Sequence, residues 1–221
     1  MKTPAASRKA GPYLIQRAYK LLFARFGPQH WWPGDTPFEI MVGAILTQNT
    51  NWRNVSRAID NIKEKRLLEP KRLYEQRHLI PSLITPSGFY RLKSKRLTAF
   101  LKYFIEHYDA DINKMKRVPT ARLRRELLGV PGIGQETADS ILLYAVKRPV
   151  FVVDAYTRRI FSRHSLFDSN PGYEEIRALF ERHVPHRPKL YNEYHALIVR
   201  CAKEFCKKNE PRCTDCPLNA V

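Results

Sequence analysis

The sequence lacks any long hydrophobic run. No stretch of about 18 or more consecutive apolar residues occurs in its 221 residues, which excludes a transmembrane helix of ordinary length. The first 11 residues are basic and lack the apolar core of a secretory signal peptide, so we expect a disordered arm able to contact a nucleic-acid backbone. Both absences indicate an intracellular protein that is not attached to a membrane.

Acidic residues are also scarce. Asp and Glu number 21 against 39 Lys and Arg, which gives a formal net charge of +18 at pH 7. This excess is larger than solubility requires, and it favours a polyanionic partner because binding to phosphates releases condensed counterions. The alternative is a generally basic surface of the kind found on ribosomal proteins. We therefore expect the partner to be a nucleic acid.

Strand patterns are nearly absent, and so are repeats, heptads and low-complexity tracts. The single β-like run is 150–153, and its short length between a proline and Asp154 favours an extended link between helices. Apolar residues elsewhere recur at helical spacing. The predicted helices cover residues 13–26, 36–47, 51–66, 91–108, 120–128, 135–146, about 170–183 and 188–203. The sequence predicts an all-α fold with helix 36–47, which opens on a Thr cap and a proline and is apolar nearly all round, at its centre.

The most informative motif is the run LGVPGIG at 128–134. Proline lacks a backbone N–H and glycine permits positive φ, so one helix must end here before the next begins. Such a hairpin exposes N–H groups at the start of the second helix, which suits a phosphate. Asp154 follows the hairpin, and a carboxylate near a phosphate site in a basic protein indicates chemistry on a nucleic acid. The alternative for Asp154 is an N-cap of the following helix, and the two roles are compatible.

Cysteine is confined to the end of the sequence. All four residues, Cys201, Cys206, Cys213 and Cys216, lie within the last 21 residues. In an intracellular protein this clustering favours a metal site over disulfides. The metal could be zinc, and the alternative to any metal site is a set of buried thiols.

In this order the motifs resemble the helix-hairpin-helix, Gly/Pro-rich, Asp-containing (HhH-GPD) superfamily of DNA glycosylases, and within it the endonuclease III branch. The resemblance covers nearly the whole chain and includes LTQNT at 46–50 and SGFYRLKSK at 87–95. It implies two helical domains with DNA bound in the cleft between them. Residues 30–148 would form a six-helix domain that ends with the hairpin. Residues 1–29, an arm and a helix, would pack with residues 149–221.

Position 136 departs from part of this family. Members that also cut the DNA backbone carry a lysine two residues after the last hairpin glycine, and its amine forms a Schiff base with the sugar. Here Glu136 stands at that position, and neither it nor Gln135 can form a Schiff base. The resemblance therefore implies a monofunctional glycosylase without AP-lyase activity. Asp154 would be its catalytic residue, which stabilises positive charge on the deoxyribose or orients the attacking water.

All three tryptophans, Trp31, Trp32 and Trp52, lie close in sequence to Gln48. This arrangement resembles the endonuclease-III-like 3-methyladenine DNA glycosylases, in which such aromatics line the base pocket. A cationic alkylpurine would be bound there by stacking and cation–π attraction, worth about 1–3 kcal/mol. Glu136 would add a negative charge or a hydrogen bond. The alternatives are ordinary core tryptophans and a surface carboxylate near a helix N-terminus.

The resemblance also assigns contacts to DNA and to a cofactor. Gln48 would enter the gap left by a flipped base, where the alternative is a solvated loop amide. Backbone phosphates would be contacted by residues of the hairpin and of the cysteine loop, namely Gly132, Ile133, Gly134, Lys207, Lys208 and Arg212. The spacing of Cys206, Cys213 and Cys216 is similar to that of the first three ligands of the family's 4Fe–4S cluster. The fourth ligand is expected one residue past Val221, and Cys201 corresponds to no ligand.

We therefore expect a monofunctional DNA N-glycosylase of base excision repair that removes alkylated purines such as 3-methyladenine from double-stranded DNA. It would act as a monomer, and in a prokaryote it would be found with the nucleoid in the cytoplasm. Two alternatives remain open. One is a mismatch glycosylase that removes uracil or thymine opposite guanine, and the other is a DNA-binding module without catalytic activity. The spacing of Asp154 argues against the second.

Overall fold

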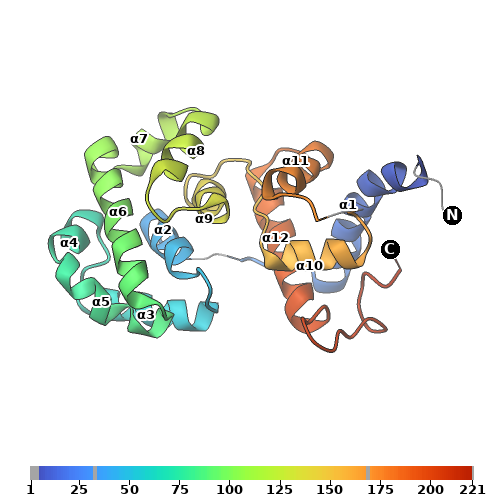
Figure 1. Cartoon of the computed structure of the whole chain (residues 1–221), viewed down its shortest axis with the longest axis horizontal. Coiled ribbons are helices and arrows are strands. Elements are labelled where there is room, and N and C mark those ends of the chain that lie inside the picture. The colour runs from blue at the N-terminus through green and yellow to red at the C-terminus, as the bar shows by residue number, and fades with distance from the viewer. Residues whose placement is uncertain (1–4, 32–33, 168–169, 221) are drawn as a thin grey trace. The chain divides into compact units, whose positions relative to one another are not determined.

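The computed structural model describes residues 5–31, 34–167 and 170–220, with side chains from residue 13 onward. Within these ranges every regular element is a helix, which confirms the all-α fold (Figure 1). Trp32, one of the predicted pocket residues, lies outside the described residues. No described helix combines the length and the apolar character needed to cross a membrane.

The chain divides into two compact units. Unit 1 consists of Met1–Trp31 and Pro149–Val221, and unit 2 is the continuous segment Trp32–Arg148. The helices of unit 1 are α1 (Ala5–Phe26), α10 (Ala155–Arg163), α11 (Tyr173–His183) and α12 (Pro188–Glu204). Those of unit 2 are α2 (Pro37–Leu46), α3 (Trp52–Glu64), α4 (Pro70–Glu75), η1 (Arg77–Leu79), α5 (Ile80–Leu83), η2 (Thr85–Ser87), α6 (Tyr90–Tyr108), α7 (Ile112–Arg117), α8 (Thr120–Gly129), α9 (Gln135–Ser140) and η3 (Ile141–Ala145).

Helix α1 begins well before its predicted start at residue 13. It reaches back to Ala5, so most of the segment expected to be a disordered arm is helical. Three alanines, Arg8 and Lys9 favour this extension, whereas Gly11 and Pro12 disfavour a helix interior, so composition explains only its first part.

Unit 1 is built around an aromatic core. The rings of Phe151 and Phe180 stack with their centroids 4.4 Å apart, and Tyr191 meets Phe151 edge-on at 5.4 Å. The hydroxyl of Tyr194 donates a hydrogen bond of 2.6 Å to the carbonyl of Ile15 and so ties α12 to α1. These contacts fix α12, which carries one side of the candidate site.

The extended link at 150–153 leads into that site. All four of its residues are buried, and the link pairs with no strand in the part of the chain that the structure describes. Side chains of α11 hold it instead, because the N–H of Phe151 donates to Glu181 (3.0 Å) and the N–H of Val153 donates to the hydroxyl of Tyr173 (3.3 Å). The link therefore holds Asp154 at a defined position at its end.

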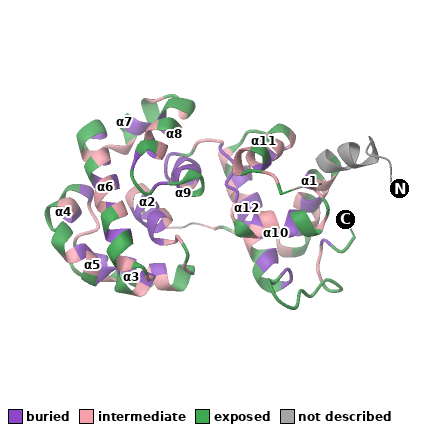
Figure 2. Ribbon diagram, viewed as in Figure 1, coloured by how far each residue is buried: buried purple, intermediate pink, exposed green. Residues whose placement is uncertain are grey.

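Helix α2 is the centre of unit 2, as its apolar sequence predicts. It contacts α3, α6, α9 and η3, and seven of its ten residues are buried (Figure 2). The predicted cap is present, since Oγ1 of Thr36 accepts a hydrogen bond of 3.1 Å from the N–H of Glu39. Gln48 follows the end of α2 and lies at the surface of unit 2.

The second helix of the hairpin is interrupted where the sequence predicts one continuous helix. Helix α9 ends at Ser140, and Ile141–Ala145 forms a π-helical turn in which the N–H of Val146 donates to the carbonyl of Ile141 (3.1 Å). Residues 141–146 are all buried. A wider turn of this kind accommodates an extra residue without ending the helix, and the sequence pattern carries no signal for it.

Candidate active site

Asp154 is fixed at the N-terminus of α10. Its Oδ1 accepts hydrogen bonds from the backbone N–H (2.7 Å) and from the hydroxyl (2.9 Å) of Thr157. Asp154 therefore is an N-cap, the role raised as the alternative to catalysis. The cap occupies Oδ1 alone, and 12% of the side chain remains exposed.

The other carboxylate oxygen faces a buried histidine. Nε2 of His195, on α12, lies 3.3 Å from Oδ2 of Asp154, and His195 is only 5% exposed. Burial raises the pKa of the Asp154 carboxyl, but the electrostatic interaction with His195 and the hydrogen bonds from Thr157 outweigh burial, so its pKa lies below the usual value of 3.8. Asp154 is ionised at neutral pH.

Sequence reasoning missed His195, although a local signal for it exists. On α12 it shares the buried face with Tyr191, Tyr194 and Ile198, at helical spacing. A titratable side chain on an otherwise apolar helix face requires a polar partner. What the sequence cannot supply is the identity of that partner, because Asp154 lies on another helix.

Trp31 packs directly on this histidine. The two rings stack with centroids 5.5 Å apart and an interplanar angle of 24°. The carbonyl of Trp31 accepts a hydrogen bond of 3.3 Å from Asn192, one turn earlier on α12. Trp31 is therefore a neighbour of the carboxylate through His195, a position compatible with its predicted role in a base pocket.

The hairpin in unit 2 has the conformation that its sequence predicts. Gly132 has a φ of +85°, and a Cβ there would lie 2.2 Å from Cγ of Arg96, so only glycine fits. Gly134 is the N-cap of α9, and both glycines are exposed, as the phosphate site requires. Ile133 lies between them, and its predicted DNA contact stays a prediction. Its side chain is buried and its N–H donates to the carbonyl of Val130 (3.0 Å), so it anchors the hairpin.

Gln48 is held against this hairpin. Its Nε2 donates to the carbonyl of Gly132 (3.1 Å) and to the hydroxyl of Thr137 (2.9 Å), while its Oε1 accepts from Arg96. The amide is thus not the freely solvated group of the alternative interpretation. To enter the gap left by a flipped base, it must exchange these bonds for bonds to DNA.

Lys93, a buried residue in the first turn of α6, holds together the end of α2 and the segment that precedes α6. Nζ of Lys93 donates to the carbonyls of Leu46 (2.7 Å) and Ser87 (2.6 Å). Burial, and to a lesser degree the charge of Arg96, lowers the pKa of Lys93 to about 8. These bonds fix the backbone just before Phe89. The side chain of Phe89 is 67% exposed and its backbone has a left-handed φ of 46°. Sequence reasoning did not single out this exposed aromatic residue.

Two further predicted pocket residues lie in unit 2. Trp52 begins α3 and is 37% exposed, and its ring covers Gly43 of α2 so closely that a Cβ there would lie 3.1 Å from Cη2. Glu136 is exposed in the first turn of α9. Both side chains are thus at the surface of the unit that carries the hairpin and Gln48.

The cysteine loop does not gather the three predicted ligands. Cys206 is buried with its Sγ 3.3 Å from Nη1 of Arg163, and Cys213 is exposed. Sγ of Cys216 lies 3.8 Å from Sγ of Cys201, the cysteine that the resemblance left unassigned. Their mutual hydrogen bond lowers the pKa of Cys216 and raises that of Cys201. Over the described ranges, no three His, Cys, Asp or Glu residues are placed to hold one metal ion, so the thiols as they lie do not fit a common cluster.

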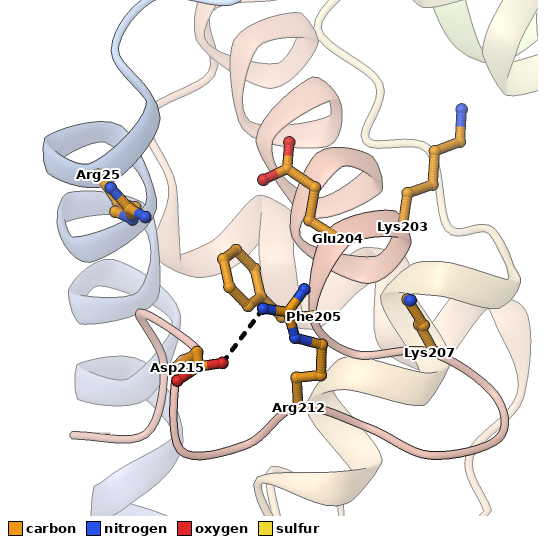
Figure 3. Close-up of a pocket in the computed structure, with 7 residues that line it drawn as sticks. All are labelled: Arg25, Lys203, Glu204, Phe205, Lys207, Arg212 and Asp215. Carbon is orange, nitrogen blue, oxygen red and sulfur yellow. Dashed lines mark hydrogen bonds and ion pairs between the residues drawn. The ribbon is translucent and has the colours of Figure 1, made fainter.

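The same loop borders a basic cavity of about 740 Å³ in unit 1 (Figure 3). Its lining residues are Arg25, Lys203, Glu204, Phe205, Lys207, Arg212 and Asp215. Arg212 lies 3.3 Å from Asp215, and Arg163 holds the loop by donating to the carbonyls of Lys207 (2.7 Å) and Lys208 (3.0 Å). The side chains of Lys207, Lys208 and Arg212 remain exposed, as phosphate contacts would require.

An all-helical chain with a glycine hairpin, a large positive net charge and a capped, partly exposed carboxylate belongs to the class of helix-hairpin-helix proteins that act on DNA. Residues 42–186 match the model of the HhH-GPD superfamily of base excision DNA repair proteins. A Methanocaldococcus jannaschii protein provisionally named a DNA repair glycosylase is 48% identical over 93% of this chain and 94% of its own length.

Two solved structures are similar in fold. The H. pylori 3-methyladenine DNA glycosylase MagIII, bound to 1,N6-ethenoadenine, has a TM-score of 0.74 and 28% identity over 88% of this chain and 97% of that one. A trapped endonuclease III–DNA covalent intermediate has a TM-score of 0.81 and 20% identity over 95% of this chain and 94% of that one. The chain belongs to the HhH-GPD superfamily, and it is a DNA glycosylase of base excision repair.

Proposed function

We propose that this protein is a monofunctional DNA glycosylase that removes alkylated purines such as 3-methyladenine from duplex DNA. The observation that carries the proposal is a combination of two features. Asp154 is ionised and fixed by its hydrogen bonds, and Glu136 occupies the position at which a lyase would need an amine. Without an amine nucleophile, water must attack C1′ of the deoxyribose as the N-glycosidic bond breaks. The products are the free base and an abasic site.

Asp154 supplies the negative charge for this reaction. Bond cleavage leaves oxocarbenium character on the sugar, and a preorganised carboxylate stabilises that charge without reorganising at the moment of reaction. The exposed fraction of the side chain leaves it accessible to the sugar or to the attacking water. An alkylated purine is a good leaving group because its ring is already cationic, so no strong general acid is required.

Recognition is assigned to the remaining residues. We propose that Trp31, Trp32, Trp52 and Glu136 bind the cationic base, and that Gln48 replaces it in the duplex. The exposed hairpin glycines and the basic cysteine loop support phosphate binding by Gly132, Gly134, Lys207, Lys208 and Arg212. No step of the reaction passes through a 4Fe–4S cluster. Iron and sulfide analysis of the purified chain tests whether Cys206, Cys213 and Cys216 hold one.

A panel of duplex substrates tests the proposal. Single-turnover release of free base is measured from DNA that contains 3-methyladenine, uracil opposite guanine, or a G·T mismatch, with Asp154→Asn as the inactive control. We expect release of the alkylated base alone. Release of only uracil or thymine would establish the mismatch activity instead, and release from none would leave a DNA-binding module.

A further inference from the structure

The Asp154 carboxylate has more polar partners than an N-cap requires. A cap requires one carboxylate oxygen, and Thr157 occupies Oδ1 with two donors. The second oxygen could face solvent, yet it faces Nε2 of His195 at 3.3 Å. Burying an imidazole to 5% exposure costs desolvation free energy that capping does not require.

The histidine ring packs on one side against Trp31, with the two centroids 5.5 Å apart. The helix that carries it, α12, is fixed to α1 by the hydrogen bond from the Tyr194 hydroxyl to the carbonyl of Ile15. Stacking and burial therefore restrict the orientation of the imidazole that faces Asp154. Thr157 and His195 together define the plane of the carboxylate, which a single capped oxygen would leave free to rotate about the Oδ1 contacts.

We propose that His195 is a positioning residue for Asp154, with its Nε2–H donating to Oδ2 and holding the carboxylate in the plane from which it stabilises the sugar. This inference rests on the proposed glycosylase activity. It assigns to that activity a further residue, His195, which acts through Asp154 and does not touch the substrate. Catalysis by a fixed charge depends on orientation, so a loss of this bond slows base release more than it weakens DNA binding.

Two variants at position 195 separate the hydrogen bond from the packing. His195→Phe keeps a ring against Trp31 and loses the donor, and we expect single-turnover release of 3-methyladenine to slow by about 30-fold, or about 2 kcal/mol at 1.36 kcal/mol per tenfold. The dissociation constant for the same DNA should change by about twofold or less. His195→Gln restores an N–H donor and should return the rate to within about fivefold of the wild type.

The matched control lies one turn earlier on the same buried helix face. Tyr191→Phe deletes the hydroxyl that donates to the carbonyl of Val184 (3.2 Å) without touching Asp154 or Trp31. Its excision rate should stay within about twofold of the wild type. A folded His195→Phe protein with wild-type excision, or a His195→Gln protein no faster than His195→Phe, overturns the proposal.

A second measurement does not depend on activity, and its deciding readout comes from the wild-type chain. The ¹⁵N spectrum of the His195 ring in the wild-type chain reports whether Nε2 carries a proton, and we expect a protonated Nε2 whose shift changes in Asp154→Asn. An unprotonated Nε2 overturns the proposal. If the wild type releases no base from any duplex, the proposed function fails, while this spectrum still decides whether His195 donates to Asp154.

Discussion

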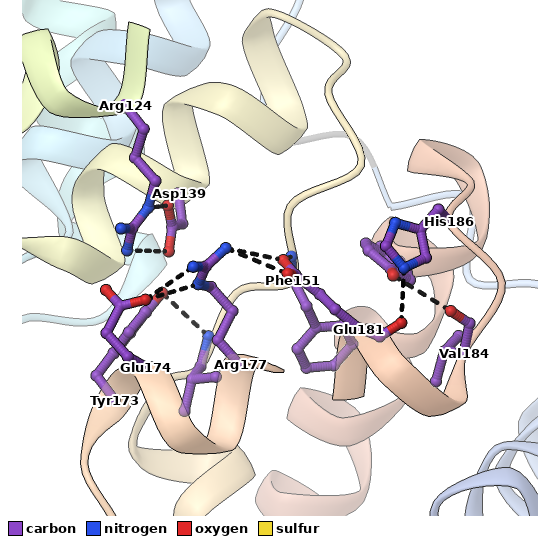
Figure 4. Close-up of polar contacts among 11 residues, drawn as sticks. Arg124, Asp139, Phe151, Tyr173, Glu174, Arg177, Glu181, Val184 and His186 are labelled. Carbon is purple, nitrogen blue, oxygen red and sulfur yellow. Dashed lines mark hydrogen bonds and ion pairs between the residues drawn. The ribbon is translucent and has the colours of Figure 1, made fainter. Parts of the chain in front are cut away.

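Asp139 in unit 2, which is fully buried, and Asp154 in unit 1, which keeps 12% of its side chain exposed, are held in different ways. Asp139 is fully buried and forms a two-pronged ion pair with Arg124, at 2.6 and 3.1 Å, which ties α9 to α8 (Figure 4). Asp154 receives neutral donors from Thr157 on one oxygen, faces His195 with the other and keeps an exposed fraction.

The difference separates a carboxylate that holds the fold from one that is available for chemistry. A full counter-charge with matched geometry neutralises Asp139 and stabilises the two hairpin helices. Asp154 is oriented and kept ionised by weaker partners, so its charge remains available to a developing cation. We therefore propose that the kind of partner, rather than burial alone, distinguishes the carboxylate suited to catalysis.

The largest expected effect is on the stability of unit 2. Asp139→Asn keeps the shape of the side chain but replaces the carboxylate that pairs with the mostly buried guanidinium of Arg124 by a neutral amide, and we expect a loss of about 3–5 kcal/mol in the free energy of unfolding. Urea unfolding measures this loss. Protein that remains folded should excise alkylated bases at close to the wild-type rate, and a stable but inactive variant would remove the distinction between the two aspartates.

The same substitution at Asp154 should lower the rate of base release and leave the stability of the protein almost unchanged. Asp154→Asn keeps an oxygen for the cap and removes the charge, so base release should slow at least about 100-fold, or roughly 2.7 kcal/mol of barrier. DNA binding should be largely retained, and the unfolding free energy should fall by no more than about 1 kcal/mol. A near wild-type single-turnover rate would reduce Asp154 to a cap.

The tryptophans test recognition separately from the charge. Alanine at Trp31, Trp32 or Trp52 should weaken excision of a cationic alkylpurine by about 1–3 kcal/mol at the position that stacks on the base, with little change in binding to undamaged DNA. A core tryptophan would instead cost about 3–5 kcal/mol of stability. Thermal unfolding paired with single-turnover excision distinguishes the two outcomes, and large losses in melting temperature with normal excision would rule out a pocket wall.

The smallest expected effect is an absence of acid inactivation. The pKa of Asp154 is lowered below 3.8, so the charged form persists as pH falls from 7 to about 5, and excision should not decline through this group in that window. The stability linked to the same shift is present above the unfolded-state pKa and is lost only as pH falls below it. An acid limb near pH 6 that disappears in Asp154→Asn would show that the carboxyl has a raised pKa.

Local patterns predicted much of this molecule, and contacts between distant segments did not follow from them. Thr36 and the glycine hairpin determine helix ends through neighbouring residues, so their roles could be predicted from spacing. The stacking of Trp31 on His195 joins segments far apart in the chain, and no local pattern encodes it. For Ile133 the motif gives a position in the hairpin but does not show that its side chain is buried.

The cysteine loop and the short helices of unit 2 show the same limit. Spacing grouped Cys206 with Cys213 and Cys216, whereas the fold brings Cys216 to Cys201 on α12. Residues 70–87 form four short elements, too brief to show a helical period in the sequence. In each case tertiary packing, rather than local preference, determines the structure.

The most direct test of the account is the fate of the DNA strand during base release. The wild-type chain is incubated with a 3-methyladenine duplex and borohydride at neutral pH, and free base, covalent protein–DNA complex and strand cuts are measured in the same reaction. With Glu136 in place of an amine, free base should appear without a stoichiometric covalent complex, and strands should break only after alkali or heat. Efficient trapping of the protein on DNA would contradict the monofunctional mechanism.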